Sequence, residues 1–280
     1  MNKGISQQDY EGFREFLEDA SGIVLGDSKH YLVASRLSRL LGEYSLHSLG
    51  DLLEKMRSGR IPGLRERVIE AMTTNETYWF RDHHPFEILK QTILPEFAQR
   101  RGQPVRIWSA ACSTGQEPYS ISMAVDEYLQ TRPGSLPGGV QIIATDISPA
   151  VLKEAREASY DALALSRGLS EQRKQRFFIQ KGPRWEVRPE VRARVSFREL
   201  NLLDSYALLG RFDVIFCRNV LIYFSAASKR DILERMAAIL VPRGYLVLGA
   251  SESMTNYSEV FETVRCQPMG VVYRKKADIR

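Results

Sequence analysis

The chain has 280 residues, of which 44% are hydrophobic and 26% charged, and its formal net charge is +5 at pH 7. This length allows one or two domains with a large buried core. No run approaches the roughly 20 apolar residues of a membrane-spanning helix. The N-terminal segment is polar and acidic and lacks the apolar core of a signal peptide. We therefore expect a cytoplasmic protein without direct membrane insertion.

The positive charge and the cysteines exclude little else. Residues 151–200 hold 12 Lys or Arg against 7 Asp or Glu and so carry the whole excess. Such a basic segment can attract nucleic acid, anionic lipid or an acidic protein surface, or it can be a solvated face. The cysteines, Cys112, Cys217 and Cys266, have no metal-ligand spacing, so we expect neither a disulfide framework nor a metal site.

Residues 1–80 show helical spacing of apolar residues and predict a small helical domain. The helix expected over residues 31–41 is flanked by Lys29 and carries Arg36 and Arg39, and the two arginines share one face because they lie three residues apart. A binding face and a solvated stripe are equally good interpretations of these cations.

Residues 81–104 are expected to be a linker, because Pro95, Gly102 and Pro104 surround a basic run. From Val105 to the end of the chain, strands alternate with helices, which predicts an α/β domain over 105–280 with a parallel sheet. The predicted strands are 105–109, 140–145, 195–199, 212–217, 245–249 and 270–273. The segment 261–267 leads through Pro268 into the last strand, which favours an antiparallel hairpin at the sheet edge.

Between the second and third of these strands, residues 165–195 interrupt the alternation. Phe177 to Ile179 and Trp185 to Val187 flank a Gly182-Pro183 turn, which is typical of a small β-hairpin. The segment therefore predicts an inserted β-subdomain that coincides with the basic segment.

The most informative motif is Ser109-Ala-Ala-Cys-Ser-Thr-Gly-Gln-Glu-Pro-Tyr-Ser120, which follows the first predicted strand and enters a helix. Small residues let the backbone approach a ligand, and a helix N-terminus offers free N–H groups. Dinucleotide-binding loops usually carry three glycines, whereas this motif has only Gly115. The Glu117 carboxylate suits a ligand with hydroxyls or a positive centre better than a pyrophosphate. The turn predicts a nucleoside ligand without phosphates.

Asp146 ends the second predicted strand, the position from which doubly wound folds hold ribose hydroxyls. The alternative is a cap of the next helix, whose start is expected at Ser148-Pro149. Together with Glu117, Asp146 favours a site for S-adenosylmethionine, because the sulfonium and ribose lack the charge of a dinucleotide.

Three further motifs lie where a ligand could meet them. They are Thr73-Thr-Asn-Glu-Thr-Tyr-Trp-Phe-Arg-Asp82, Asn201-Leu-Leu-Asp204 and Phe212-Asp-Val-Ile-Phe-Cys-Arg-Asn-Val-Leu-Ile-Tyr-Phe224. Asn75, Asn201 and Asn219 could each be turn residues or caps, but their places after strands and at a domain joint favour a site.

These motifs closely resemble those of the bacterial chemotaxis receptor methyltransferases, the CheR-type enzymes, over nearly the whole chain. The resemblance implies a small all-α domain followed by a Rossmann-like class I S-adenosylmethionine-dependent methyltransferase domain with an inserted antiparallel β-subdomain. It also implies methyl transfer to receptor glutamate side chains, which gives γ-methyl esters and S-adenosylhomocysteine. The implied partner is the cytoplasmic helical bundle of methyl-accepting chemoreceptors, and we expect a monomer that does not bind nucleic acid.

Residue roles follow from the same resemblance. It assigns contacts with S-adenosylmethionine to Asn75, Thr77, Arg81, Glu117, Asp146, Asn201, Leu202, Arg218 and Asn219. It places Arg81 and Tyr223 nearest the transferred methyl as catalytic residues. Receptor contacts by Lys29, Arg36 and Arg39 are a weaker inference, because the motifs say little about these helices.

The chemistry suits these residue types. A glutamate carboxylate with a pKa of about 4.3 is ionised at neutral pH, so its attack on a sulfonium methyl needs no general base. We hypothesise that Arg81 orients the carboxylate through paired hydrogen bonds. The adjacent His83 and His84 have poor geometry for a metal site and favour a surface or capping role.

Some family members dock a receptor tail peptide through a glycine-rich loop of the hairpin. Here the loop Lys181-Gly-Pro-Arg-Trp-Glu186 is short and has one glycine, so we expect activity without such a tether.

Two other functions stay open. A nucleic-acid or amide-nitrogen methyltransferase usually carries Asn-Pro-Pro-Tyr where this chain has Asn219-Val-Leu-Ile-Tyr223. An adaptor could bind S-adenosylmethionine without turnover, although the motif set is intact.

Overall fold

The computed structural model describes residues 5–98, 100, 102–254, 257–266 and 270–277, and these divide into two compact units. The first comprises Met1–Thr74 with Tyr223–Ser228, and the second comprises Asn75–Ile222 with Lys229–Arg280. The break at 74/75 lies a few residues before the predicted end of the helical domain at residue 80.

The first unit is helical, as predicted. Its helices are α1 Gln7–Ser21, α2 His30–Glu43, α3 Leu49–Ser58 and α4 Leu64–Met72. Ser6 and Ser48 cap α1 and α3 by accepting hydrogen bonds from Asp9 N–H and Asp51 N–H. Apolar residues three or four apart give each helix one buried face, and these faces form one core that includes Tyr10, Phe13, Leu17, Val33, Leu37, Leu52 and Val68.

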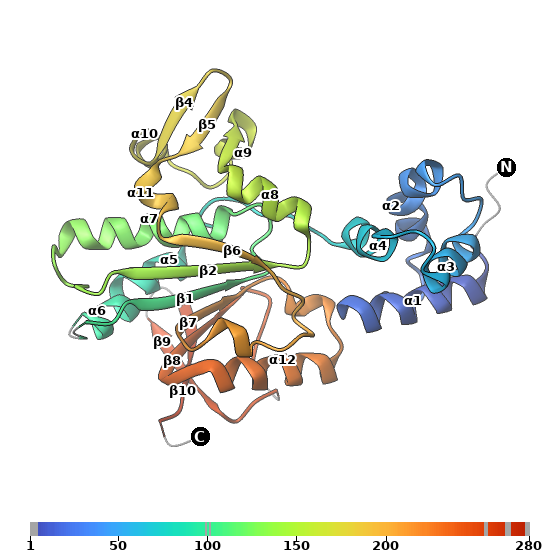
Figure 1. Ribbon diagram of the computed structural model, residues 1–280. Coiled ribbons are helices and arrows are strands. Elements are labelled where there is room, and N and C mark those ends of the chain that lie inside the picture. Colours follow the sequence, from blue (N-terminus) through green and yellow to red (C-terminus); the bar gives the residue numbers. More distant parts are fainter. Residues whose placement is uncertain (1–4, 99, 101, 255–256, 267–269, 278–280) are drawn as a thin grey trace. The chain divides into compact units, whose positions relative to one another are not determined.

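In the described part of the second unit, a seven-stranded sheet has the order β6-β2-β1-β7-β8-β10-β9 (Figure 1). The strands are β1 Val105–Ala110, β2 Val140–Asp146, β6 Val195–Glu199, β7 Phe212–Cys217, β8 Leu240–Leu248, β9 Phe261–Cys266 and β10 Gly270–Lys275. From β6 to β8 the neighbours are parallel, whereas β10 is antiparallel to both β8 and β9. The predicted parallel sheet with an antiparallel edge is confirmed, although Gln267 and Pro268 lie outside the described residues.

Helices connect these strands and complete the core. They are α5 His84–Ile88, the π-helix η1 Leu89–Ile93, α6 Leu94–Phe97, α7 Gln116–Thr131, α8 Pro149–Glu157 and α12 Ala226–Ile239, with 3-10 turns η2 Ala207–Leu209 and η3 Leu221–Tyr223. Residues 84–97 are helical where the sequence analysis expects the linker 81–104. Their apolar residues, including Phe86, Ile88, Leu89 and Ile93, are buried with the sheet in one core. In the sequence, the Pro and Gly residues of the segment obscure this apolar pattern.

The insertion forms a second small sheet of order β3-β5-β4 within the described residues. Its elements are β3 Ser159–Asp161, α9 Ala162–Ser166, α10 Glu171–Phe177, β4 Phe178–Lys181, β5 Arg184–Val187 and α11 Pro189–Arg192. Figure 1 shows this hairpin projecting beside the large sheet, near β6. The predicted hairpin is confirmed, while β3 is a strand that sequence patterning missed because it has only three residues.

Half-buried ion pairs join the insertion to α7. Arg173 on α10 donates two hydrogen bonds to Glu127, at 2.7 and 2.9 Å, and stacks 3.6 Å from the Phe80 ring centroid. Arg176 and Arg194 both pair with Asp126. Much of the basic segment is therefore neutralised inside the unit, which accounts for cations that the sequence left without partners.

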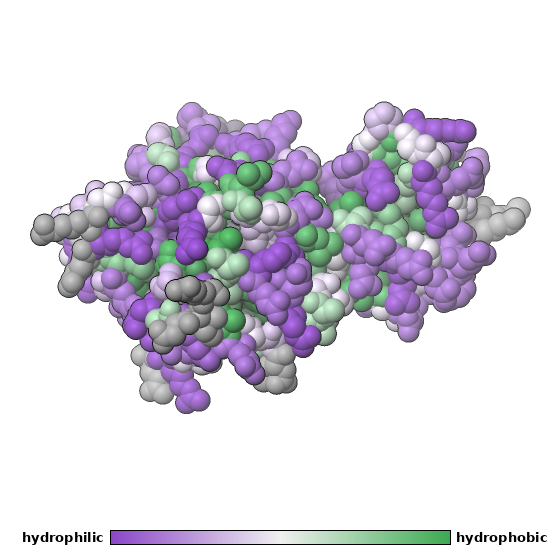
Figure 2. All heavy atoms as spheres, turned by 60° about the horizontal axis from the view of Figure 1, so that its bottom comes forward, coloured by the Kyte–Doolittle hydropathy of each residue, from purple (hydrophilic) through white to green (hydrophobic). Residues whose placement is uncertain are grey.

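Hydrophilic residues cover most of the face shown in Figure 2, with small apolar areas between them. Among the described residues no helix combines the length and apolar character required to cross a bilayer.

Gly168 offers a test of how closely the insertion packs against the backbone of Trp79. Its φ of +82° suits glycine, and a Cβ placed on it would lie 1.9 Å from the Trp79 carbonyl oxygen. We expect Gly168→Ala to lower the free energy of unfolding by about 3 kcal/mol, because positive-φ strain adds to a backbone clash. Gly182→Ala is the matched control, since its φ is +60° but nothing lies near its Cβ position, and should cost about 1 kcal/mol.

The measurement is urea unfolding followed by tryptophan fluorescence, which reports on this unit because Trp79, Trp108 and Trp185 all lie in it. Equal losses for the two variants would show that the close approach of Gly168 to Trp79 is unimportant.

Candidate functional site

The carboxyl ends of β1, β2, β7 and β8 meet at one edge of the sheet, and the order of strands reverses between β1 and β7. Ala110 is in register with both Thr145 and Cys217, and Cys217 is in register with Leu248. Ligands of open α/β sheets bind in the crevice at such a reversal. The loops that follow these strands therefore bring the predicted motifs together.

The turn after β1 has an unusual backbone. Ala111 and Ser113 have φ values of 56° and 50°, and Gly115, which begins α7, has a φ of 95°. A Cβ on Gly115 would lie 3.0 Å from Ala155 Cβ and 3.1 Å from the Tyr160 hydroxyl. The single glycine of the motif is thus required for close packing of α7 against α8, and the left-handed residues turn the backbone sharply before the helix.

Glu117 lies in the first turn of α7 with both carboxylate oxygens engaged. Ser109 Oγ donates to Oε1 at 2.8 Å, and Arg218 donates to Oε2 at 3.0 Å. Burial raises the pKa of Glu117 above its ordinary value, although the Arg218 charge and the Ser109 hydrogen bond oppose this shift. Each oxygen has a further lone pair, so the carboxylate can still accept a ligand hydroxyl.

Arg218, which follows β7, is the central charge of the site, and its side chain is only 1% exposed. Besides Glu117, its guanidinium binds the Asp82 carboxylate at 2.7 Å and the Arg81 carbonyl at 2.9 Å. The structure therefore places Arg218 as the link between α7 and the segment that carries Arg81. Its Nε has no hydrogen-bond partner within the described residues.

Asp146 joins the turns after β1 and β2. Its carboxylate accepts Ser113 N–H at 2.8 Å and Ser148 N–H at 3.0 Å, and Ser148 Oγ, not Asp146, caps α8 through Val151 N–H. Burial raises the pKa of Asp146, while the amides that donate to it oppose the shift. The capping alternative is therefore wrong for α8, and lone pairs on Asp146 are left for ribose hydroxyls.

Glu252 is a component of the site that the sequence analysis missed. Its Oε2 accepts N–H groups of Gly249 and Asn219, at 2.8 and 2.7 Å, and its Oε1 accepts those of Val220 and Leu221. These bonds hold Asn219 at a φ of 58° after β7. The only signal in the sequence is an acid shortly after a strand, Gly249-Ala-Ser-Glu252, which is common in turns.

Residues 75–81 run past the turn after β1. Ser113 Oγ donates to the Asn75 carbonyl at 2.9 Å, which brings Asn75 to the turn after β1. Arg81 donates to the Glu76 carbonyl at 3.1 Å, and its guanidinium lies 5.4 Å from the Tyr78 ring centroid. Thr77, between them in the sequence, is partly buried. The contact of Asn75 with Ser113 places the start of this segment beside the turn after β1.

Asn201 and Leu202 follow β6. Asn201 Oδ1 accepts Leu203 N–H at 3.0 Å, which forms a tight turn, and Leu202 is buried. The carbonyl of Leu202 accepts hydrogen bonds from the Tyr206 hydroxyl and from Arg235, so this turn is fixed in place. The turn interpretation of Asn201 is confirmed, and it leaves the predicted ligand role untested.

Four predicted residues belong to the first unit: Lys29, Arg36 and Arg39, which were expected to contact the receptor, and Tyr223. Arg36 donates to the Met72 and Thr73 carbonyls and to Thr74 Oγ1, so it anchors α2 to the end of α4. Arg39 is 90% exposed and pairs with Glu43, and the Tyr223 carbonyl accepts Val24 N–H at 2.8 Å.

The chemistry of this edge is that of binding and positioning. Among the described residues no group of three or more His, Cys, Asp or Glu could hold a metal ion. Burial raises the pKa values of the Cys112 and Cys217 thiols well above the ordinary value, which makes them poor nucleophiles. The groups that remain are the buried carboxylates of Glu117 and Asp146 and the backbone amides of the turns. They fit a nucleoside with hydroxyls and no phosphate.

Comparison with known proteins gives matches over both units. The family model described as "CheR methyltransferase, all-alpha domain" matches residues 8–73, and "CheR methyltransferase, SAM binding domain" matches residues 75–269. Chemotaxis protein methyltransferase 1 of Pseudomonas aeruginosa is 57% identical over 270 residues, which is 96% of this chain and 98% of that protein. The chemotaxis protein methyltransferase of Vibrio parahaemolyticus is 54% identical over 273 residues, or 97% and 98% of the two chains. That of Salmonella typhimurium is 37% identical over 278 residues, or 98% and 93%.

The Glu252 turn generates a prediction. Glu252→Gln replaces one accepting oxygen with an NH2 group that faces backbone donors, so we expect a loss of about 2–3 kcal/mol of unfolding free energy. Glu259→Gln, which removes the same charge from an exposed position, should change stability by less than about 0.5 kcal/mol. Urea unfolding of both variants measures the difference, and a Glu252→Gln variant as stable as Glu259→Gln would contradict this role.

Proposed function

The chain belongs to the CheR methyltransferase family, and we propose that it transfers methyl groups to particular glutamates on the cytoplasmic helical bundle of chemoreceptors. It is an S-adenosylmethionine-dependent protein-glutamate O-methyltransferase. What supports the proposal most is one observation: Glu117, Asp146 and the Arg218-bound segment of Arg81 share the strand edge where the family motifs lie.

The residues fit S-adenosylmethionine in type and place. We assign polar groups of the nucleoside to Glu117 and Asp146, whose buried carboxylates retain accepting lone pairs. The methionine end is assigned to Asn75, Thr77 and Arg81, and the remaining contacts to Asn201, Leu202, Arg218 and Asn219. Arg218 acts mainly by holding Glu117, because its guanidinium is almost fully buried and already bonded.

When bound, S-adenosylmethionine supplies an electrophilic methyl group on a sulfonium. The chain's own residues need only align an already ionised glutamate with it and exclude water. We assign the orientation of that carboxylate to Arg81, whose backbone is fixed by Arg218. Tyr223 is the second proposed catalytic residue, and it is not essential as a base because the nucleophile arrives deprotonated.

Receptor contact is assigned to the helical unit. Of its three predicted cations, Arg39 is exposed and Lys29 precedes α2 next to the exposed Tyr31, so both can meet an acidic helical bundle. Arg36 keeps a structural role, since its guanidinium binds the end of α4. The reaction needs neither a second copy of the chain nor nucleic acid, and it would take place in the cytoplasm.

The central test is transfer of radiolabelled methyl from S-adenosylmethionine to chemoreceptor-containing membranes, followed by mild alkali. Carboxyl methyl esters release volatile methanol, whereas N-methyl groups are stable, so we expect enzyme-dependent volatile counts. Alkali-stable label would indicate nitrogen methylation. Tight cofactor binding without any label would favour the adaptor function.

Arg81→Ala is the variant for this assay. At saturating S-adenosylmethionine we expect its turnover to fall by about a hundredfold, because the incoming carboxylate loses its orienting partner. Normal turnover of Arg81→Ala would show that the residue does not position the substrate.

Cofactor affinity should depend on pH through Glu117. Because its pKa is raised above the ordinary 4.5, Glu117 gains its proton at a higher pH than an exposed glutamate, and S-adenosylhomocysteine affinity should decline from that pH downward. Glu117→Gln should bind about 10–100-fold more weakly at pH 7 and show a flatter pH profile, with the remainder due to Asp146. Glu157→Gln, an exposed control, should match the wild type.

Calorimetric titration across pH measures these affinities. Parallel pH profiles for the wild type and Glu117→Gln would exclude Glu117 as the titrating ligand.

We also propose that activity is independent of a receptor tail peptide. The hairpin turn is only Gly182-Pro183 between β4 and β5, and Lys181 pairs with Glu186 across it at 2.7 Å. We expect no measurable heat when a synthetic pentapeptide with the C-terminal sequence of a tethering receptor is titrated into the enzyme. Saturable binding of that peptide would overturn the proposal.

A further inference from the structure

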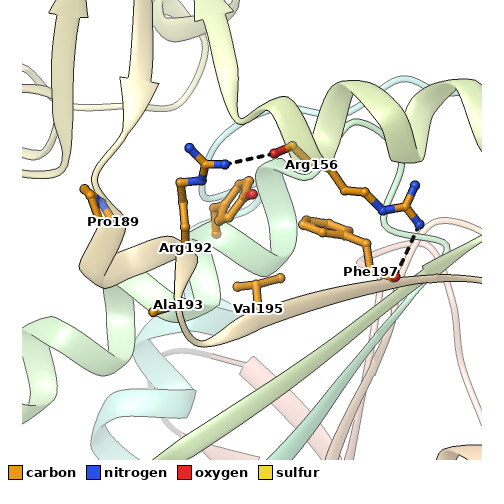
Figure 3. Close-up of a pocket in the computed structure, with 7 residues that line it drawn as sticks. Arg156, Pro189, Arg192, Ala193, Val195 and Phe197 are labelled. Atoms are coloured by element: carbon orange, nitrogen blue, oxygen red, sulfur yellow. Dashed lines mark hydrogen bonds between the residues drawn. The ribbon is translucent and has the colours of Figure 1, made fainter.

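A cavity of about 440 Å³ lies in the second unit, apart from the residues assigned to the nucleoside (Figure 3). Its walls come from the start of α7, the end of α8, the helix α11 and the first half of β6. None of its lining residues is among the predicted site residues. A volume of this order is typical of small-molecule sites.

The floor of the cavity is apolar and aromatic. Figure 3 shows the Phe197 ring reaching into it above Val195. The Tyr119 ring meets Phe197 with centroids 5.6 Å apart and an interplanar angle of 68°. Tyr119 is buried under this contact, so the flat apolar surface open to a planar ring is that of the half-buried Phe197.

The rim carries two arginines that lack a counter-charge. Arg192 donates to the Arg156 carbonyl at 3.1 Å, and Arg156 donates to the Phe197 carbonyl at 3.3 Å. Neither guanidinium forms an ion pair within the described part of the chain, and no lining residue is acidic. By contrast, Arg173, Arg176 and Arg194 of the same subdomain all pair with carboxylates.

Tyr119 does not neutralise this charge. Its hydroxyl donates to the Ala155 carbonyl at 2.8 Å and is also hydrogen-bonded to Arg192, and burial raises its pKa well above the ordinary value, so the phenol stays neutral. We propose that this cavity binds a small planar aromatic anion, with the ring on Phe197 and the anionic group paired with an arginine of the rim, Arg156 or Arg192.

The test uses 2-naphthoate as the probe, titrated calorimetrically into the enzyme with saturating S-adenosylhomocysteine so that the nucleoside site is filled. We expect one saturable site with a dissociation constant below about 1 mM. Neutral 2-naphthamide should bind at least about tenfold more weakly, because it lacks the charge. No saturable binding, or equal binding of the amide, overturns the proposal.

Two kinds of variant locate the probe. Arg156→Gln combined with Arg192→Gln should weaken 2-naphthoate at least about tenfold, and Ala193→Phe, which fills the cavity, should abolish binding. Lys153→Gln removes a charge from an exposed position of the same α8 and should bind as the wild type does. Tryptophan fluorescence confirms that each variant is folded, and unchanged binding in both cavity variants overturns the assignment.

Discussion

A buried guanidinium is tolerated only where its charge is balanced, and Arg218 imposes this condition on the whole candidate site. Its partners are Glu117 from the first turn of α7, Asp82 and the Arg81 carbonyl. The site depends on Arg218, because its removal would leave the Glu117 and Asp82 carboxylates without a counter-charge. The same three bonds hold Glu117, the proposed nucleoside-binding acid, and Arg81, the proposed substrate-orienting arginine, in a fixed relation.

The loops around Arg218 and its two carboxylate partners contain strained backbone, which carboxylate acceptors hold in place. Ala111, Ser113 and Asn219 adopt left-handed backbone conformations, which cost free energy in residues other than glycine. Asp146 and Glu252 offset that cost by accepting backbone N–H groups from these turns. A site built in this way needs little rearrangement when cofactor binds, which suits a reaction whose catalysis is mainly alignment.

The sequence was sufficient for the architecture and the nucleoside turn, since alternating strands and helices, the Gly115 turn and a strand-end Asp146 are local patterns. It failed where the interaction is long-range. Glu252 is one acid in a polar turn, and its four amide partners come together only when β7 and β8 pair. The sequence predicts a linker over 81–104, because its prolines and basic residues outweigh the apolar pattern of residues 84–97, whose burial depends on packing against the sheet. Arg218 matched a family motif, but its burial between two acids follows from tertiary structure alone.

The most direct test of the account is a double-mutant cycle on S-adenosylhomocysteine binding with Glu117→Gln, Arg218→Gln and their combination. If the pair acts as one unit, the second substitution adds little to the first, and the coupling energy is about 1–3 kcal/mol. Arg230→Gln, exposed on α12, controls for the loss of positive charge. Strictly additive losses in folded variants would contradict the claim that Arg218 assembles the cofactor site through Glu117.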